Sequence, residues 1–254
     1  MGDGVRAGMS GKTYSPILEL RMYTLRKGRR DEMIELFDRE LIEPREEVGI
    51  QIIGQFRDVD NPKRWTWLQG FDDMQSRGEA LNAFYTSPAW KANAKAANAT
   101  IVDSGNVLLL HPARPDSGFK LKAGNRPPRG STAPQAGFVA ATIYYFDEPV
   151  EEEFIEFFET KIQPILKTCG ANLLGYFVTE ESPNSYPRLA IREGEHVFVW
   201  LAGFPESEAH EVWMRRLKES NAWGEVQTSI KKYIKGEPES MRLTPTPRSR
   251  LTGV

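Results

Sequence analysis

The sequence has very little cysteine and no long apolar segment. Its 254 residues include a single cysteine, Cys169, which excludes an intrachain disulfide framework and fits a reducing compartment. A membrane-spanning helix needs about 18 or more apolar residues in a row, and no such run occurs. Residues 1–16 also lack the apolar run of a signal peptide. We therefore expect a cytoplasmic protein with no membrane partner.

The chain also lacks a strong charge of either sign. It contains 33 Lys and Arg against 35 Asp and Glu, for a formal net charge of −2. Proteins that hold phosphate backbones normally present a positive surface field. Nucleic acid is therefore not an expected partner, and 40% hydrophobic with 27% charged residues is typical of a globular protein.

Motifs of several common enzyme classes are missing as well. No glycine-rich phosphate loop, Gly-x-Ser-x-Gly elbow or kinase signature occurs. His111, His196 and His210 have no second His or Cys at metal-ligand spacing, and Cys169 has no evident histidine partner. The sequence therefore predicts no metal site and no cofactor.

The chain does contain an internal repeat. Residues 67–71 read WLQGF and residues 200–204 read WLAGF, and a tryptophan follows nineteen residues after each phenylalanine, at Trp90 and Trp223. Both pairs are 133 positions apart, and an upstream series of proline, glycine and Gly-x-aromatic matches at an offset of 120 or 121. An ordered series with a nearly constant offset indicates a duplication.

Each copy has the same predicted order of elements, strand-helix-strand-strand-helix-strand, which is the ferredoxin-like βαββαβ motif. Alternating or β-branched segments mark the strands, and apolar stripes at helical spacing mark the helices. We predict five segments: a flexible N-terminal tail at 1–16, a first unit at 17–112, a Pro- and Gly-rich surface linker at 113–136, a second unit at 137–245, and a loose C-terminal tail at 246–254.

The opening of the first copy resembles NIPSNAP domains. Residues 19–28 (ELRMYTLRKG) are similar to the start of that family's domain, and WLQGF at 67–71 and SPAW at 87–90 are similar to its later signature. The resemblance covers the first copy well and the second more weakly. It implies the dimeric α+β barrel class, in which two ferredoxin-like units pair their antiparallel sheets. Because one chain holds both units, we expect an intramolecular barrel, or pseudo-dimer, and leave further homo-oligomerisation open.

Strand alternation divides the side chains between a helix-covered face and the barrel interior. We place Leu18, Leu20 and Met22 on the helix face, which turns the three candidate catalytic residues inward. These are Glu19, Arg21 and Tyr23. The same argument places a set of candidate ligand-binding residues in the interior: Gln55, Arg57, Trp67, Gln69, Tyr144, Tyr176 and Trp200.

Apolar walls with a few polar groups are typical of a ligand pocket. The sequence thus favours a small-molecule-binding barrel in which Arg21 and Arg57 orient an anionic, aromatic or enolic ligand. As an enzyme it would perform proton transfer or cofactor-independent oxygenation, like a monooxygenase or isomerase, with Glu19 or Tyr23 as the acid or base. Three alternatives stay open: a purely structural ion pair at these residues, a non-enzymatic scaffold whose barrel is filled by its own side chains, and haem binding, which the resemblance allows.

Overall fold

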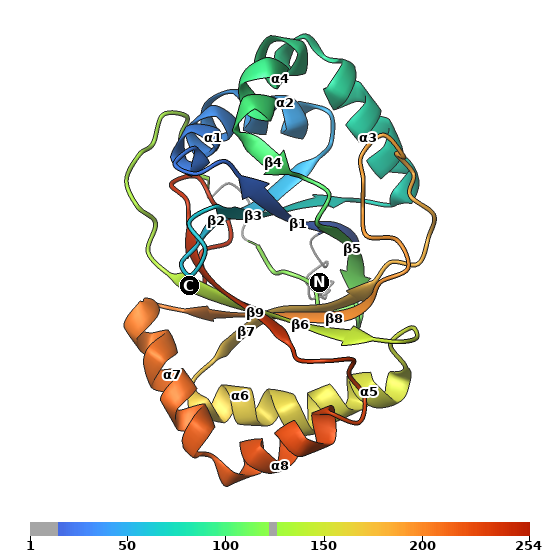
Figure 1. Ribbon diagram of the computed structural model, residues 1–254, viewed down its shortest axis with the longest axis vertical. Coiled ribbons are helices and arrows are strands. Elements are labelled where there is room, and N and C mark those ends of the chain that lie inside the picture. The colour runs from blue at the N-terminus through green and yellow to red at the C-terminus, as the bar shows by residue number, and fades with distance from the viewer. Residues whose placement is uncertain (1–14, 122–125) are drawn as a thin grey trace, which may run out of the picture.

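The computed structural model describes residues 15–121 and 126–254, and Figure 1 shows them as two helical layers on either side of a central barrel. The first half consists of β1 (Ile17–Leu25), α1 (Arg30–Leu36), a π-helical turn η1 (Phe37–Leu41), α2 (Ile42–Glu47), β2 (Gln51–Asp58), β3 (Arg64–Phe71), α3 (Met74–Thr86), α4 (Pro88–Thr100), β4 (Ile101–Asp103) and β5 (Val107–Pro112). The second half consists of β6 (Phe138–Phe146), α5 (Glu152–Phe157), η2 (Phe158–Ile162), α6 (Gln163–Cys169), β7 (Asn172–Thr179), β8 (His196–Phe204), α7 (Ser207–Glu219), α8 (Asn221–Ile230) and β9 (Glu239–Pro245).

Local signals in the two copies produce the same breaks in the helices. Ser87 accepts a hydrogen bond from the Trp90 amide at 3.1 Å, with Pro88 as the first helical residue, and Ser220 caps α8 through the Trp223 amide at 3.3 Å. A serine at this position satisfies an amide that the helix leaves unpaired. The π-helical turns also occur at matching places, so the duplication extends to local irregularities of the backbone.

Strands from both halves close one barrel. The order around it is β3-β2-β9-β6-β8-β7-β5-β1, and β1 pairs with β3 to complete the circle. The halves join twice, where β2 pairs with β9 and where β5 pairs with β7, and both junctions are antiparallel. The predicted α+β fold, with two ferredoxin-like units in one intramolecular barrel, is confirmed.

The barrel interior is packed mainly with aliphatic side chains, together with Phe56, Phe119 and Phe177, and the predicted face assignment is wrong. Leu18, Leu20 and Met22 join one cluster with Val139 and Val199 of the second half, so these residues point into the barrel. The other face of β1 turns toward the helices. Alternation separated the two sets correctly, but both faces of this sheet are buried, so periodicity could not tell which one was inside. An eight-stranded barrel is just wide enough for medium-sized side chains to fill, which favours the aliphatic set.

The linker and the C-terminal segment contribute to the core. Phe119 of the linker and Leu251 near the C-terminus both join the barrel cluster, and the Leu251 amide donates to the Ile53 carbonyl at 2.9 Å. Thr246 and Arg248 are also buried. The expectation of a loose tail at 246–254 is therefore wrong, and the linker is more than a surface connection. The predicted N-terminal tail, up to residue 14, lies outside the described residues.

Candidate functional site

In the first half, a cluster of charged and polar side chains fills the space between the sheet and the helices. We call Glu19, Arg21, Gln69 and Arg77 the first-half ion network. Glu19 accepts hydrogen bonds from Arg77 Nε at 2.7 Å and Gln69 Nε2 at 2.5 Å, and it also pairs with Arg21. Arg21 in turn donates to the Tyr23 hydroxyl at 2.8 Å. Glu19, Arg21 and Arg77 are completely buried.

The network fixes the protonation state of its members. Burial by itself raises the pKa of Glu19, but Arg21, Arg77 and the hydrogen bond from Gln69 outweigh burial and hold the pKa below its usual range. Burial raises the pKa of Tyr23 to about 12, so its phenol stays neutral. Glu19 is thus an ionised carboxylate whose oxygens are both occupied. The predicted catalytic trio does lie together, but as a set of groups that satisfy one another.

A loop from the second half covers this network. Residues 180–195 connect β7 to β8, and Arg77 Nη1 donates to Asn184 Oδ1 and Ser185 Oγ in that loop, at 3.0 Å each. The Tyr186 ring stacks on Tyr85 of α3, with centroids 5.9 Å apart. These contacts close the helix-facing layer of the first half.

The matching positions of the second half carry small side chains. In the first half Glu19 pairs with Gln69 across the sheet and Arg21 with Trp67. In the second half Ala140 pairs with Ala202, and Thr142 with Trp200. The tryptophan is thus kept, while two charges and an amide are replaced by two alanines and a threonine.

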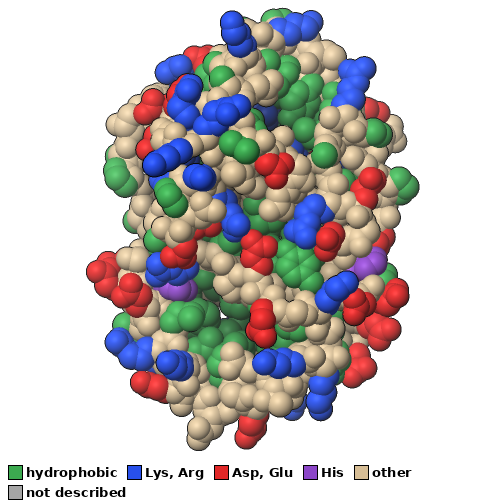
Figure 2. All heavy atoms as spheres, in the orientation of Figure 1, with side chains coloured by type: hydrophobic (Ala, Val, Ile, Leu, Met, Phe, Trp, Pro, Cys, Tyr) green, Lys and Arg blue, Asp and Glu red, His purple; other side chains and the backbone are tan. Residues whose placement is uncertain are grey.

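A cavity of about 370 Å³ occupies the space that these small residues leave. It lies between the sheet and the helices α7 and α8, and Figure 2 shows hydrophobic side chains gathered in a hollow of the lower half of the molecule. Its lining residues include Ala140, Thr142, Tyr144, Trp200, His210, Trp213, Met214, Leu217, Trp223, Gln227, Met241, Arg242 and, from the first half, Asp60. We call it the second-half cavity.

Two buried polar atoms at the second-half cavity have no hydrogen-bond partner among the described residues: Nε1 of Trp200 and Nδ1 of His210. The imidazole of His210 is 4% exposed and packs against the rings of Phe138, Phe204 and Trp213, with centroids 4.9, 5.1 and 5.4 Å away. Unpaired buried polar groups are costly, and a ligand that pairs with them removes that cost.

Burial also sets the charge state of the cavity's titratable groups. Burial, together with the nearby guanidinium of Arg242, lowers the pKa of His210 to about 4, so the imidazole is neutral near pH 7. Burial raises the pKa of Tyr144 to about 12, so the phenol is a neutral donor. The Trp200 indole N–H lies near enough to the phenol oxygen to oppose this rise, although the two do not meet the geometry of a hydrogen bond. The buried wall of the second-half cavity is therefore apolar and aromatic with neutral polar groups, and the charged residues Arg242 and Asp60 lie at its exposed edge.

Of the predicted ligand-binding residues, the structure brings Tyr144 and Trp200 into this cavity, which lies on the helix side of the sheet and not in the predicted barrel interior. Gln55 is buried beside Asp38, the guanidinium of Arg57 is 2.9 Å from Asp31, and the hydroxyl of Tyr176 is 2.6 Å from Glu159. These three residues face helices at other places, and their predicted position inside the barrel is wrong. Trp67 and Gln69 likewise face the first-half helices, around the ion network.

Sequence reasoning missed His210 as a pocket residue. It stands 133 positions after Arg77, the same offset that relates the two WLxGF strings, so the repeat identifies it as the counterpart of Arg77 but does not show that a cavity lies beside it. Within residues 15–121 and 126–254, no group of three or more His, Cys, Asp and Glu side chains could hold a metal ion. None of the helices in the same ranges combines the length and apolar character needed to cross a bilayer.

Comparison with known proteins agrees with this architecture. Residues 18–114 match the NIPSNAP family model, which confirms the resemblance of the first copy. A search of curated proteins by sequence found no match. Among solved structures, a proposed monooxygenase from Fusobacterium nucleatum is 12% identical, with a TM-score of 0.54 over 94% of this chain and 96% of that one.

Two further structures have the same fold. A proposed monooxygenase from Lactobacillus acidophilus is 15% identical, with a TM-score of 0.51 over 94% of this chain and 99% of its own. An anthrone oxidase-like protein is 14% identical, with a TM-score of 0.52 over 95% of this chain and 99% of its own. At these identities the likeness establishes the shared barrel fold and nothing of the chemistry.

Proposed function

We propose that this chain, whose residues 18–114 are a NIPSNAP domain, binds a planar aromatic metabolite in its second-half cavity. One observation carries the proposal: where the first half has a packed ion network, the second half has a cavity of about 370 Å³ with aromatic walls. That volume falls at the lower end of the range for small-molecule sites, roughly 300–1,000 Å³. A ligand of a few fused rings fits such a space.

The unpartnered polar atoms suggest how a ligand is oriented. The indole N–H of Trp200 can donate to a carbonyl or hydroxyl oxygen of the ligand, and the phenol of Tyr144 supplies a second donor from the neighbouring strand. His210 is the neutral group on the α7 side of the cavity. A flat ring carrying one oxygen would thus complete the hydrogen bonds that the protein leaves open.

The same arrangement supports oxygenation of an activated ketone without a cofactor. The imidazole of His210 accepts a proton from an acidic carbon, and the negative charge of the enolate that forms beside it offsets the burial that otherwise disfavours the imidazolium. Trp200 and Tyr144 donate to the oxygen of that enolate. Molecular oxygen then bonds to the carbanion, and loss of water leaves a quinone. One anthrone and one O₂ give one anthraquinone and one water. Anthrone is chosen as the test substrate because its ketone activates the opposite ring carbon and because one structure of the same fold is described as anthrone oxidase-like.

The test compares two tryptophans at matching positions. Isothermal titration of 2-naphthol should give saturable binding, and Trp200→Phe should weaken it about tenfold because a buried hydrogen bond is lost. Trp67→Phe is the matched control, since Trp67 occupies the same register in the first half, and its Nε1 is likewise unpaired. Equal losses in both variants, or no binding to the unmodified protein, would contradict the proposal. Oxygen uptake with anthrone tests the enzymatic step separately.

One observation favours a second candidate, a non-enzymatic scaffold. The barrel interior is filled by the protein's own side chains, with Phe119 and Leu251 completing its core. A scaffold would need no ligand, so it predicts that filling the second-half cavity leaves the protein's function intact. The cavity between the sheet and helices α7 and α8, which a self-filled scaffold does not need, favours the ligand-binding function over this alternative.

A further inference from the structure

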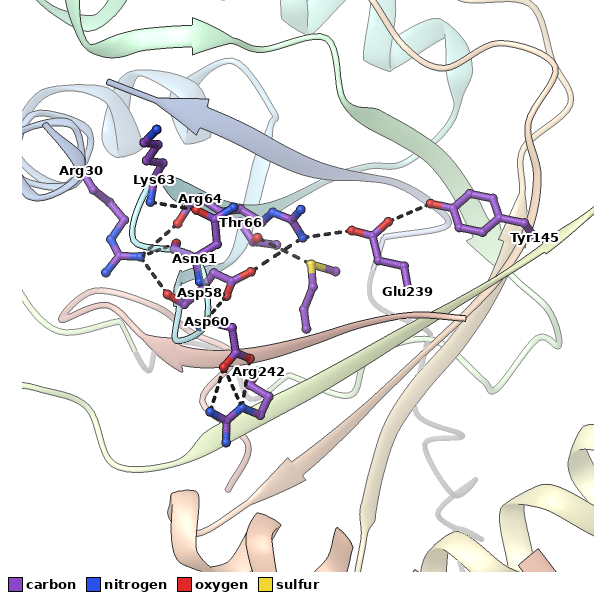
Figure 3. Close-up of polar contacts among 11 residues, drawn as sticks. Arg30, Asp58, Asp60, Asn61, Lys63, Arg64, Thr66, Tyr145, Glu239 and Arg242 are labelled. Atoms are coloured by element: carbon purple, nitrogen blue, oxygen red, sulfur yellow. Dashed lines mark hydrogen bonds and ion pairs between the residues drawn. The ribbon is translucent and has the colours of Figure 1, made fainter. Parts of the chain in front are cut away.

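An ion pair between the two halves stands at the mouth of the second-half cavity. Arg242 of β9 and Asp60 of the β2–β3 turn both line the cavity, and Figure 3 shows their side chains facing each other. Arg242 Nη2 lies 2.9 Å from Asp60 Oδ1, and Arg242 Nε lies 3.0 Å from Asp60 Oδ2. The two side chains are 37% and 57% exposed. A pair so exposed contributes little stability and can exchange partners.

The carboxylate of Asp60 belongs to a turn that is held by several hydrogen bonds. Asp58 Oδ1 accepts hydrogen bonds from the amides of Asp60 and Asn61 at 2.8 and 2.9 Å, and Arg30 Nη1 donates to the carbonyls of Asp58 and Asn61 at 2.8 and 3.1 Å (Figure 3). The guanidinium, in contrast, is carried by a long side chain on a strand. If the pair opens, Arg242 is therefore the member that can turn toward the cavity.

Arg242 is the only lysine or arginine among the cavity-lining residues that the structure describes. The positive charge of Arg242 is felt inside the cavity, because it repels a proton on His210 and so adds to the effect of burial in lowering the pKa of that imidazole. A guanidinium holds a carboxylate through two parallel hydrogen bonds, as it now holds Asp60. Asp60 thus occupies the place that an anionic ligand group would take.

We propose that the ligand of this cavity is an aromatic carboxylate, whose ring lies among the tryptophans and whose carboxylate replaces Asp60 on Arg242. This inference rests on the proposed function and names its ligand class. The sequence suggested Arg21 and Arg57 as the residues that bind an anion. The inference gives that role to Arg242, at the entrance of the second-half cavity. Asp60 then acts as an internal competitor contributed by the first half.

The experiment uses two probes of the same shape, 2-naphthoate and its neutral counterpart 2-naphthamide, titrated by calorimetry. The unmodified protein should prefer the carboxylate about tenfold, as expected for one charge-assisted bidentate contact. Arg242→Gln should abolish that preference and leave naphthamide binding unchanged. Asp60→Asn should tighten naphthoate binding a few-fold, because it removes the competing charge. Arg64→Gln is the control, since Arg64 pairs with Glu239 at 2.9 Å and does not line the cavity.

The outcomes separate this inference from the function on which it rests. Binding of both probes with equal affinity overturns the carboxylate assignment and leaves the aromatic cavity in place. Failure of both probes to bind overturns the proposed function as well. Arg242→Lys keeps the charge without the fork, so an intermediate preference in that variant supports the bidentate contact even if Arg242→Gln does not fold. An unchanged preference in the lysine variant and in Asp60→Asn refutes that contact.

Discussion

The two halves of the molecule use the layer between sheet and helices in opposite ways. In the first half Glu19 and two arginines fill it, all completely buried. In the second half Ala140 and Thr142 stand at the positions of Glu19 and Arg21, and a cavity of about 370 Å³ remains. The strand register around both sites is the same, so the difference lies in the side chains and the loops. One half is built as a solid core and the other as a chamber.

The two halves differ at every member of the buried ion network, and the cost of an unpaired buried charge explains why no single member remains in the second half. A carboxylate held by two guanidinium groups tolerates burial only while all partners are present, since each remaining charge would otherwise stand unpaired. In the second half Ala140, Thr142, Ala202 and His210 together replace Glu19, Arg21, Gln69 and Arg77. No charge that needs a buried partner is left behind, because burial keeps His210 neutral near pH 7.

The connecting loops strengthen the contrast. In the second half β7 ends at Thr179 and β8 begins at His196, and the long loop between them reaches over the first half and closes its helix-facing layer. In the first half β2 ends at Asp58 and β3 begins at Arg64, and this short turn contributes only Asp60 to the rim of the second-half cavity. Each half therefore contributes side chains to the helix-facing layer of the other.

Breaking the first-half ion network should have the largest effect on stability. Glu19→Ala leaves Arg21 and Arg77 buried without their carboxylate, and we expect the free energy of unfolding to fall by about 3–5 kcal/mol. Ala140→Ser changes the equivalent second-half position and should cost less than about 1 kcal/mol. Urea denaturation of both variants measures the difference. Similar losses in the two would mean that the network is not the rigid core described above.

The sequence was sufficient for the fold, because the evenly spaced repeat and the strand and helix periodicities all pointed to two βαββαβ units. It was insufficient for the position of the site. Residues 18 and 20 alternate with 19 and 21, but an apolar residue is equally at home in a barrel and under a helix, so periodicity alone leaves the two faces interchangeable. The charges of Glu19 and Arg21 pointed to a pocket, whereas the cavity lies in the other copy, where Ala140 and Thr142 stand at the matching positions. Cavities arise from missing volume, and no motif marks missing volume in a single sequence.

The neutral imidazole of the second half should produce a pH-dependent difference in stability. The pKa of His210 is about 4 in the folded state, against roughly 6.5 when unfolded. The unfolded chain therefore binds more protons between these values, and stability falls as the pH decreases through this window. Relative to His210→Phe, the unmodified protein should lose about 2 kcal/mol between pH 7 and pH 4. Parallel stability curves for the two proteins would rule out a buried, neutral His210.

A buried acid of the first half should show the opposite trend. Burial raises the pKa of Asp38 to about 6, so the folded state binds the extra proton and stability falls as the pH rises from about 4 to 6. Asp38→Asn should thus stabilise the protein by about 1–2 kcal/mol at pH 7.5 and have little effect at pH 4.

The matched second-half position of Asp38 is Glu159, which binds Arg114 and the hydroxyl of Tyr176. Burial alone raises the pKa of Glu159, but these contacts outweigh burial and lower it. Glu159→Gln should therefore not stabilise the protein at pH 7.5. Thermal unfolding of both variants at the two pH values checks the contrast, and a stabilising effect in both would show that the surroundings of the two acids do not differ as described.

Filling the second-half cavity should have the smallest effect on stability and the clearest effect on binding. Ala140 lines the cavity, so Ala140→Leu adds apolar volume to empty space and should stabilise the protein by up to about 1 kcal/mol while abolishing 2-naphthol binding. Ala80 in α3 is equally buried, at 6% exposure for each alanine, but it packs in the filled layer of the first half. Ala80→Leu should therefore cost about 1–3 kcal/mol through overpacking and leave binding intact. Replacing alanine by leucine would then raise the free energy of unfolding in one half and lower it in the other. If both variants changed the free energy of unfolding in the same direction, the distinction between a filled half and a half with a cavity would be contradicted.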